Sequence, residues 1–378
     1  MKRRQFIGFL GNSSLALLAS AAYGKAATFT SKEFVFIEAE QFANHGGWEL
    51  DQQSMEQMGS PYLLAHGLGI PVPDATTQVE FPSAGSYRMW VRTRDWVAPW
   101  NAPGAPGKFQ VWIDGKPVRE TFGTKSATWH WHDGGMVKVG KKAKIALHDL
   151  TGFEGRCEAI LFCKDANFKP VNEVEALTKF RRDVQGLSVE PEDMGHFDLI
   201  VAGGGLAGTC AAIAAARQGI KVALIQDRPV LGGNGSSEVR VWPEGHTNKA
   251  RFPHIGDIVN EILPPITKGA NQVLNGVAAS YFDDAKKLGV VRAEKGITLL
   301  VNHRVMHVET EAQEIKSLVI QSTLTSRQKR VHGRLFADCT GDANIGFKAG
   351  ADYEYKVENL MGSTNLFNVL DATNKADV

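Results

Sequence analysis

The pattern of hydrophobic and polar positions changes near residue 197. Between residues 34 and 165, short segments such as "TTQVEF" and "GKFQVWIDG" alternate apolar and polar residues, and glycine, proline and aspartate separate them. Alternation with a period of two places successive side chains on opposite faces of a strand. This series of short strands predicts a β-sandwich over residues 34–165.

The pattern after the sandwich predicts a linker and then an α/β domain. Residues 166–196 are polar and predict a linker with one amphipathic helix. From residue 197, a buried strand "FDLIVA" precedes a glycine-rich turn, a helix of small residues "TCAAIAAARQG" and a second strand "KVALIQ". This order predicts a Rossmann-like nucleotide-binding domain over residues 197–378.

The glycine-rich turn has the spacing G-x-G-x-x-G, at Gly203, Gly205 and Gly208. The first glycine permits the tight turn, the second lets a pyrophosphate approach the backbone, and the third lets the helix pack closely on the strand. Leu206 and Ala207 lie at the helix N-terminus, where free N–H groups and the positive end of the helix dipole bind phosphate. The turn therefore predicts a dinucleotide site.

The second strand ends at a position that often holds an acidic residue. That residue binds the ribose hydroxyl groups and is expected roughly 20 residues after the turn. Here the position holds Gln226, and Asp227 follows it. Either Gln226 binds the ribose as a neutral group, or Asp227 does so. An NAD enzyme needs an acid at position 226, so the sequence disfavours that alternative.

Two further motifs resemble those of a known family. "LGGNGSSE" follows the second strand, and the strand "GRLFAD" leads into Thr340–Gly341–Asp342 after a predicted β-meander. Together with the first turn, they resemble the FAD-dependent oxidoreductases of the glutathione-reductase-like two-dinucleotide fold. More narrowly, they resemble the heterodisulfide-reductase-A-like flavoproteins.

The resemblance implies FAD as the cofactor and gives roles to residues matched to its motifs. The chain lacks the cysteine grouping of an iron–sulfur cluster, and it reaches only the beginning of the substrate domain that follows in such flavoproteins. The implied domain is therefore truncated. The implied FAD-binding residues are Gly203, Gly205, Leu206, Ala207, Gly208, Gln226 or Asp227, Gly232, Gly233, Asn234, Val305 through its backbone, and Asp342.

The polar residues after the second glycine motif are the candidates for catalysis. They are Ser236, Ser237, Glu238 and His246. A histidine can act as a base near neutral pH, with a solvated loop histidine as the alternative. The two serines have a helix cap as their alternative.

The N-terminus has the features of an export signal. Residues 1–26 combine a basic start, an apolar run and small residues, and Arg3–Arg4 adds a twin-arginine pattern. The apolar run is too short for a stable membrane span. The chain has a net charge of +1, and this segment holds four basic and no acidic residues. The remainder is slightly acidic, which gives no reason to expect nucleic acid as a partner.

The first domain also resembles a known group of proteins. "FIEAEQF", "FQVWIDGKPV" and "WHWHDGG" are similar to segments of carbohydrate-binding modules of families 6 and 35, which have a galactose-binding-like jelly-roll fold. The resemblance implies a structural calcium ion at Glu38 and Glu40, with two solvated glutamates as the alternative. Trp96 and Trp100, in a loop rich in proline and glycine, are the expected sugar platform.

The sequence predicts an exported FAD-dependent oxidoreductase with a carbohydrate-binding-like domain in front. It would transfer a hydride from a C–H bond of a small-molecule or saccharide substrate to the flavin. A non-catalytic glycan-binding protein with a remnant flavin domain is the first alternative. An NAD-binding Rossmann enzyme is the second.

Overall fold

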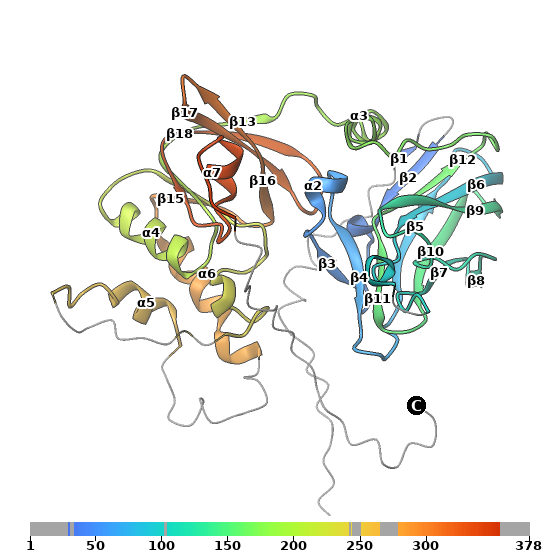
Figure 1. Ribbon diagram of the computed structural model, residues 1–378, viewed down its shortest axis with the longest axis horizontal. Coiled ribbons are helices and arrows are strands. Elements are labelled where there is room, and N and C mark those ends of the chain that lie inside the picture. The colour runs from blue at the N-terminus through green and yellow to red at the C-terminus, as the bar shows by residue number, and fades with distance from the viewer. Residues whose placement is uncertain are drawn as a thin grey trace, which may run out of the picture. The chain divides into compact units, whose positions relative to one another are not determined.

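The computed structural model describes residues 29–30, 34–101, 104–241, 243, 251–264 and 279–355. The predicted export signal, His246 and the final residues 356–378 lie outside them. The chain forms two compact units, residues 1–187 and 188–378. Each unit is described by itself (Figure 1).

The first unit is built from antiparallel sheets. A five-stranded sheet contains, in order, β1 (Phe29–Thr30), β2 (Phe34–Glu38), β12 (Ala159–Cys163), β6 (Gly85–Thr93) and β9 (His130–Val139). A four-stranded sheet contains β5 (Ala75–Glu80), β10 (Lys142–Asp149), β7 (Phe109–Ile113) and β8 (Lys116–Pro117). A smaller sheet contains β11 (Phe153–Cys157), β4 (Tyr62–His66) and β3 (Glu49–Asp51). The predicted β-sandwich is thus present in the first unit, and its jelly-roll connectivity stays a prediction.

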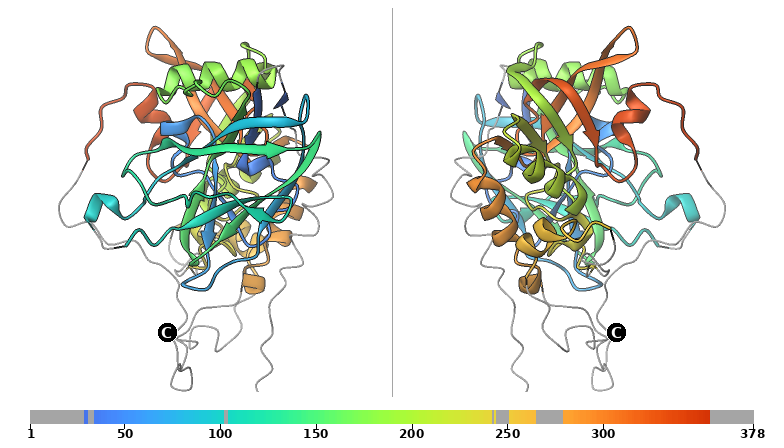
Figure 2. Two further views of the ribbon diagram at one scale, coloured as in Figure 1. Left: turned by 90° about the vertical axis from the view of Figure 1, so that its right-hand side faces the viewer. Right: turned by 90° about the vertical axis from the view of Figure 1, so that its left-hand side faces the viewer.

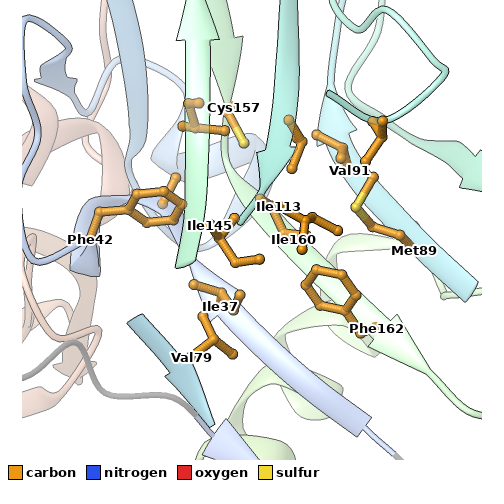
Figure 3. Packing of buried hydrophobic residues seen from close by; sticks show 14 of the residues in the cluster. Ile37, Phe42, Val79, Met89, Val91, Ile113, Ile145, Cys157, Ile160 and Phe162 are labelled. Atoms are coloured by element: carbon orange, nitrogen blue, oxygen red, sulfur yellow. The ribbon is translucent and has the colours of Figure 1, made fainter. Parts of the chain in front are cut away.

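The core of the sandwich lies between its sheets. In β5, Ala75, Thr77 and Val79 point inward and alternate with more exposed residues. Ile37 and Ile160 from the five-stranded sheet and Ile113 and Ile145 from the four-stranded sheet belong to the same buried cluster (Figure 3). The burial of this apolar surface is the main favourable contribution to folding of the unit.

One helix of the predicted linker packs on the sandwich. Helix α3 (Val174–Gln185) ends at Gly186, which has a left-handed backbone conformation. Leu177, Phe180 and Val184 pack against a second buried cluster that includes Phe36 and Trp131. This helix is therefore part of the first unit, whereas the sequence placed it in a linker of residues 166–196.

The second unit contains a six-stranded sheet. Its order is β15 (Ile297–Leu300), β14 (Val222–Ile225), β13 (Glu192–Ala202), β18 (Gln328–Asp338), β17 (Glu314–Ser322) and β16 (His303–Glu311). The pairs among β15, β14, β13 and β18 are parallel, and β17 pairs antiparallel with both β18 and β16. The prediction of a Rossmann-like domain with a β-meander therefore agrees with this sheet.

Helices cover one face of this sheet. They are α4 (Leu206–Arg217), α5 (Asp257–Ile262) and α6 (Asp284–Ala293), which share a buried cluster with alternate residues of β13 and β14. The other face packs against residues of the β-meander and of α7 (Asn344–Lys348). Figure 2 shows α4 and α6 beside the sheet. Within the described part of the chain, no helix has the length and apolar character needed to cross a membrane.

Candidate FAD-binding site

The glycine-rich turn follows β13 and leads directly into α4. Gly203 has a φ of +104°, and a Cβ atom there would lie 2.1 Å from the carbonyl oxygen of Cys339. A Cβ at Gly208 would lie 1.9 Å from the carbonyl oxygen of Gly203. A Cβ at Gly205 would meet no heavy atom within 4 Å. The outer two glycines are thus required by the protein's own packing, and the middle one faces open space.

The two glycine motifs lie against each other. The N–H of Gly232 donates to the carbonyl of Gly204 at 2.8 Å, and Gly205 and Gly232 form an isolated parallel bridge. A Cβ at Gly233 would lie 3.1 Å from the Cα of Gly205. The structure therefore brings together two motifs that the sequence only suggested belonged to one site.

Gln226 connects these motifs from inside the protein. Its side-chain oxygen accepts a hydrogen bond from the N–H of Gly204 at 2.7 Å. Its side-chain nitrogen donates to the carbonyl of Val230 at 3.1 Å. Only 5% of Gln226 is exposed. Both polar groups of this amide bind backbone atoms, those of Gly204 and Val230. Asp227 is therefore the better placed candidate for binding the ribose hydroxyl groups.

Asp227 lies beside the turn between β15 and β16. Its carboxylate is 3.6 Å from Nη1 of Arg304 and its side chain is 35% exposed. The N–H of His303 donates to the carbonyl of Gln226 at 2.9 Å, which fixes the start of β16 next to this segment. Val305 is buried in β16 and pairs with Ile320. Asp227 and the backbone near Val305 therefore lie in one region, as the predicted adenosine site requires.

The third motif follows β18, at the same level of the sheet. The N–H of Cys339 donates to the carbonyl of Ala202 at 2.7 Å, so the turn after β18 lies beside the turn after β13. Asp338 accepts hydrogen bonds from the hydroxyl of Thr340 at 2.7 Å and from the N–H of Ile345 at 2.8 Å. Partial burial acts to raise the pKa of Asp338, but these hydrogen bonds outweigh it and the pKa lies below its ordinary value.

Asp342, the residue singled out from the sequence, is exposed in the turn that Asp338 organises. The carboxyl ends of β13, β14 and β18 therefore carry all three motifs. In open α/β sheets, ligands bind at these ends, where the strand order reverses.

This part of the chain matches a known family. Residues 198–370 match the model of the family described as FAD dependent oxidoreductase. The matched residues make up most of the second unit. No protein among those with curated functions matches the chain.

Three solved structures illustrate the range of the structural matches. Glycerol-3-phosphate dehydrogenase from Bacillus halodurans, complexed with FAD, is 18% identical over 41% of this chain and 37% of its own, with a TM-score of 0.29. THI4 from Thermovibrio ammonificans is 19% identical over 49% and 73%, with a TM-score of 0.30. A family 35 carbohydrate binding module from Clostridium thermocellum is 18% identical over 34% and 96%, with a TM-score of 0.27.

Matches this distant carry no argument about function. The chain spans between 24% and 37% of the length of three of the matched structures, among them the glycerol-3-phosphate dehydrogenase.

The second unit offers groups that fit FAD. A Cβ at Gly205 would project into open space. The absence of a side chain there lets a pyrophosphate approach the backbone. The twelve-residue helix α4 begins directly after Gly205, and the first N–H groups of a helix, here near Leu206 and Ala207, have no acceptor within it and can bind phosphate. The residues present thus fit a dinucleotide pyrophosphate.

A buried ion pair, which the sequence analysis missed, supports the second glycine motif. Asp284 and Lys287 of α6 are 4% and 0% exposed, and their charged groups lie 3.2 Å apart. The Asp284 carboxylate accepts from the N–H of Ser237 at 3.2 Å. A Cβ at Gly232 would lie 3.0 Å from Cε of Lys287. The pair therefore holds both ends of the segment from Gly232 to Ser237.

Of the candidate catalytic residues that the structure describes, Ser236 and Ser237 lie in this segment and Glu238 follows it directly. Ser236 is 1% exposed, and its hydroxyl accepts from the N–H of Glu238 at 3.3 Å, so it caps a turn. Partial burial raises the pKa of the Glu238 carboxyl above its ordinary value, and Arg228, 3.2 Å away, opposes part of the rise. Asn234 is exposed beside them. Their catalytic roles stay predictions.

Replacing Gln226 tests its connecting role. In Gln226→Leu, the N–H of Gly204 and the carbonyl of Val230 lose their partner inside the protein. We expect the FAD dissociation constant to rise roughly tenfold and the domain to lose about 1–3 kcal/mol of stability. Flavin fluorescence titration measures the first and urea unfolding the second. Gln218→Leu, at an exposed position after α4, is the control. Unchanged FAD binding in Gln226→Leu would show that the connection does not matter.

In the first unit, the rings of Trp96 and Trp100 lie close together. Their ring centroids are 6.1 Å apart. Nε1 of Trp96 donates to the carbonyl of Phe153 at 3.0 Å, and the Arg156 guanidinium lies 5.2 Å from the Trp96 ring centre. Trp100 is 69% exposed. Trp96 is thus held by its neighbours, and Trp100 presents its ring to solvent.

Glu38 and Glu40 are fully buried, so the alternative of two solvated glutamates is wrong. The guanidinium of Arg181 lies against Glu38 and Glu158. No group of three or more metal-binding side chains is placed to hold an ion in the described ranges. The comparisons and the structure give no support for a calcium ion at this position.

Proposed function

We propose that the chain is an exported oxidoreductase that removes a hydride from a C–H bond of a saccharide or a related small molecule. The observation that supports this most directly is the junction of the glycine motifs at the ends of β13 and β14, within residues that match an FAD-dependent oxidoreductase family. The saccharide substrate is inferred from the resemblance of the sandwich domain to carbohydrate-binding modules. The twin-arginine pattern of residues 1–26 supports export.

The proposed binding mode places the pyrophosphate of FAD over Gly205 and the first turn of α4. Asp227 would bind the ribose of the adenosine half, and the backbone near Val305 would contact the adenine. Gly232, Gly233 and Asn234 would lie along the pyrophosphate and ribityl chain, with Asp342 near the same region. When bound, FAD supplies the electron-accepting chemistry of the reaction.

The chain's own residues would position the substrate and move a proton. When a hydride leaves the carbon of an alcohol, a base must accept the proton of its hydroxyl group. Glu238 is the described candidate, because it lies next to the flavin-binding segment and its pKa is raised above the ordinary value for a carboxyl group. Ser236 and Ser237 would orient the hydroxyl group. His246 is the alternative base.

The proposal is tested by anaerobic reduction of the purified, FAD-reconstituted chain. A panel of sugars and sugar alcohols is added, and bleaching of the visible flavin absorption is followed. We expect one substrate class to bleach it, and Glu238→Gln to slow bleaching while leaving FAD binding unchanged. If the chain binds FAD but no sugar bleaches it, the proposed substrate class is wrong. Binding to glycans without any bound flavin would favour the non-catalytic alternative.

A separate prediction concerns the sandwich. If Trp100 is the sugar platform, Trp100→Ala removes the exposed ring on which a sugar would stack, and the glycan dissociation constant should rise roughly tenfold. Trp100→Phe should retain part of the affinity. Met136→Ala, at a position 54% exposed on β9, is the control. Glycan binding is measured on an array and by titration. Equal affinities of Trp100→Ala and the wild type would refute this placement.

A further inference from the structure

Three glutamates are buried together at one end of the sandwich. Glu38 ends β2, Glu40 lies in the short 3-10 helix η2 (Ala39–Gln41), and Glu158 lies between β11 and β12. Each is 0% exposed. Three ionised carboxylates in such a place require positive charge, because an unpaired buried charge is strongly unfavourable. A calcium ion, which the resemblance to carbohydrate-binding modules implies, would be one source of it.

Arg181 of α3 supplies positive charge from within the chain. It is 3% exposed, and its Nε lies 2.5 Å from Oε1 of Glu38. One terminal nitrogen contacts Oε1 of Glu158, and the other donates to the carbonyl of Met58 at 2.7 Å. A planar guanidinium with several fixed donors is suited to bridging two carboxylates in this way.

The sequence of α3 explains why Arg181 reaches this place. Leu177, Arg181 and Gln185 are the buried residues of the helix, and their spacing of four puts them on one face. Leu177 packs on the aromatic cluster of the sandwich. Gln185, one turn beyond Arg181, donates from its side-chain nitrogen to Oε1 of Glu38 at 2.6 Å. The helix face thus supplies one apolar contact, one charge and one neutral donor.

A second arginine adds positive charge to the cluster. Arg92, 1% exposed, lies 3.5 Å from Oε2 of Glu158 and adds a second positive charge. Neither side-chain oxygen of Glu40 has a hydrogen-bond partner among the described residues. Two guanidinium groups, those of Arg181 and Arg92, therefore lie among the three carboxyl groups.

Arg181 would compete with a calcium ion for these carboxylates. The ion takes six to eight oxygen ligands at about 2.3–2.6 Å, whereas Oε1 of Glu38 and Oε1 of Glu158 already accept from Arg181 and from Gln185 and Ser60. A guanidinium between the carboxylates would also repel a second cation at this distance.

We propose that Arg181 takes the place of a structural calcium ion, so that the sandwich folds independently of divalent cations. Removal of the Arg181 side chain would then open a cation site among the three glutamates. In consequence α3 is an integral part of the sandwich, because it carries the charge that the glutamates need.

Thermal unfolding of the full chain tests this. Seven of the eight tryptophans lie before residue 188, so intrinsic fluorescence reports mainly on the first unit. The wild-type midpoint should be the same in millimolar calcium and in chelator. Arg181→Met should lower the midpoint by roughly 10 °C in chelator, and calcium should restore part of that loss. Lys179→Met, which removes an exposed charge from the same helix, should behave like the wild type.

Two results would overturn the proposal. The first is a wild-type midpoint that falls in chelator and rises with calcium, which would show that the native sandwich holds the ion. The second is an Arg181→Met protein that is as stable as the wild type, or is destabilised with no response to calcium. Calcium titration calorimetry on both proteins provides the direct binding readout.

Glu40→Gln keeps the proposal testable if Arg181→Met does not fold. Neither side-chain oxygen of Glu40 has a hydrogen-bond partner among the described residues, so the neutral glutamine leaves the contacts of Arg181 with Glu38 and Glu158 in place. We expect the midpoint of Glu40→Gln to be the same with calcium or chelator. A midpoint lower than wild type only in calcium would identify Glu40 as a calcium ligand and contradict the proposal.

Discussion

Gly203→Val is expected to abolish FAD binding. The residue has a φ of +104°, a conformation that a β-branched side chain adopts only under strain. Its Cβ would also lie 2.1 Å from the carbonyl oxygen of Cys339. That carbonyl cannot move freely, because the N–H of Cys339 is hydrogen-bonded to Ala202 in the parallel pair of β13 and β18. The turn must therefore deform, and we expect affinity to fall roughly 100-fold or more.

The measurement is FAD titration of the purified variant, with far-UV circular dichroism to confirm that its secondary structure is retained. Gly289→Ala is the matched control. Gly289 lies in α6, and a Cβ there would meet no heavy atom within 4 Å, so alanine should favour the helix slightly. Wild-type affinity in Gly203→Val would place the cofactor somewhere other than this turn.

Lys287→Met should have the second largest effect. Methionine fills nearly the same volume but leaves Asp284 charged and buried without its partner. Removal of one member of a buried ion pair costs about 3–5 kcal/mol. The segment from Gly232 to Ser237 rests on this pair through the Lys287 stem and the Asp284 carboxylate. We therefore expect both a lower urea midpoint and a weaker affinity for FAD.

The double variant Asp284→Asn with Lys287→Met separates charge from packing. It removes the unpaired charge and should recover much of the stability lost in Lys287→Met alone, because both charges are then absent. Lys295→Met, at an exposed position just after α6, is the control for the loss of a lysine. A Lys287→Met protein with wild-type stability and FAD affinity would show that the buried pair does not support the flavin-binding segment.

The glycine turn was predictable because its requirements are local. The turn between the strand and the helix holds three glycines within six residues, Gly203, Gly205 and Gly208. Their spacing alone indicates where the chain turns, where a pyrophosphate approaches the backbone and where the helix packs on the strand. The parallel pairing of β13 with β14 follows from the same unit. The joining of this turn to Gly232 was expected only from the resemblance to flavoproteins.

The contacts that hold the site were not predictable, because they join distant segments. Asp284 meets Ser237 across 47 residues of sequence, and an Asp-x-x-Lys pair on a helix is usually solvated. Gln226 occupied the position expected for a ribose-binding acid, and only the fold shows that it holds Gly204 instead. In the sandwich, Arg181 lies 143 residues after Glu38, in a segment whose polar composition indicated a linker.

Reconstitution with FAD tests whether the second unit holds the cofactor where its glycine motifs meet. The purified chain is incubated with FAD, desalted and examined for visible flavin absorption and flavin-to-protein ratio, with Gly203→Val and Gly289→Ala in parallel. We predict one FAD per chain for the wild type and for Gly289→Ala, none for Gly203→Val, and no displacement of FAD by NAD. A folded wild-type chain that stays colourless, or that releases FAD to NAD, would contradict the account.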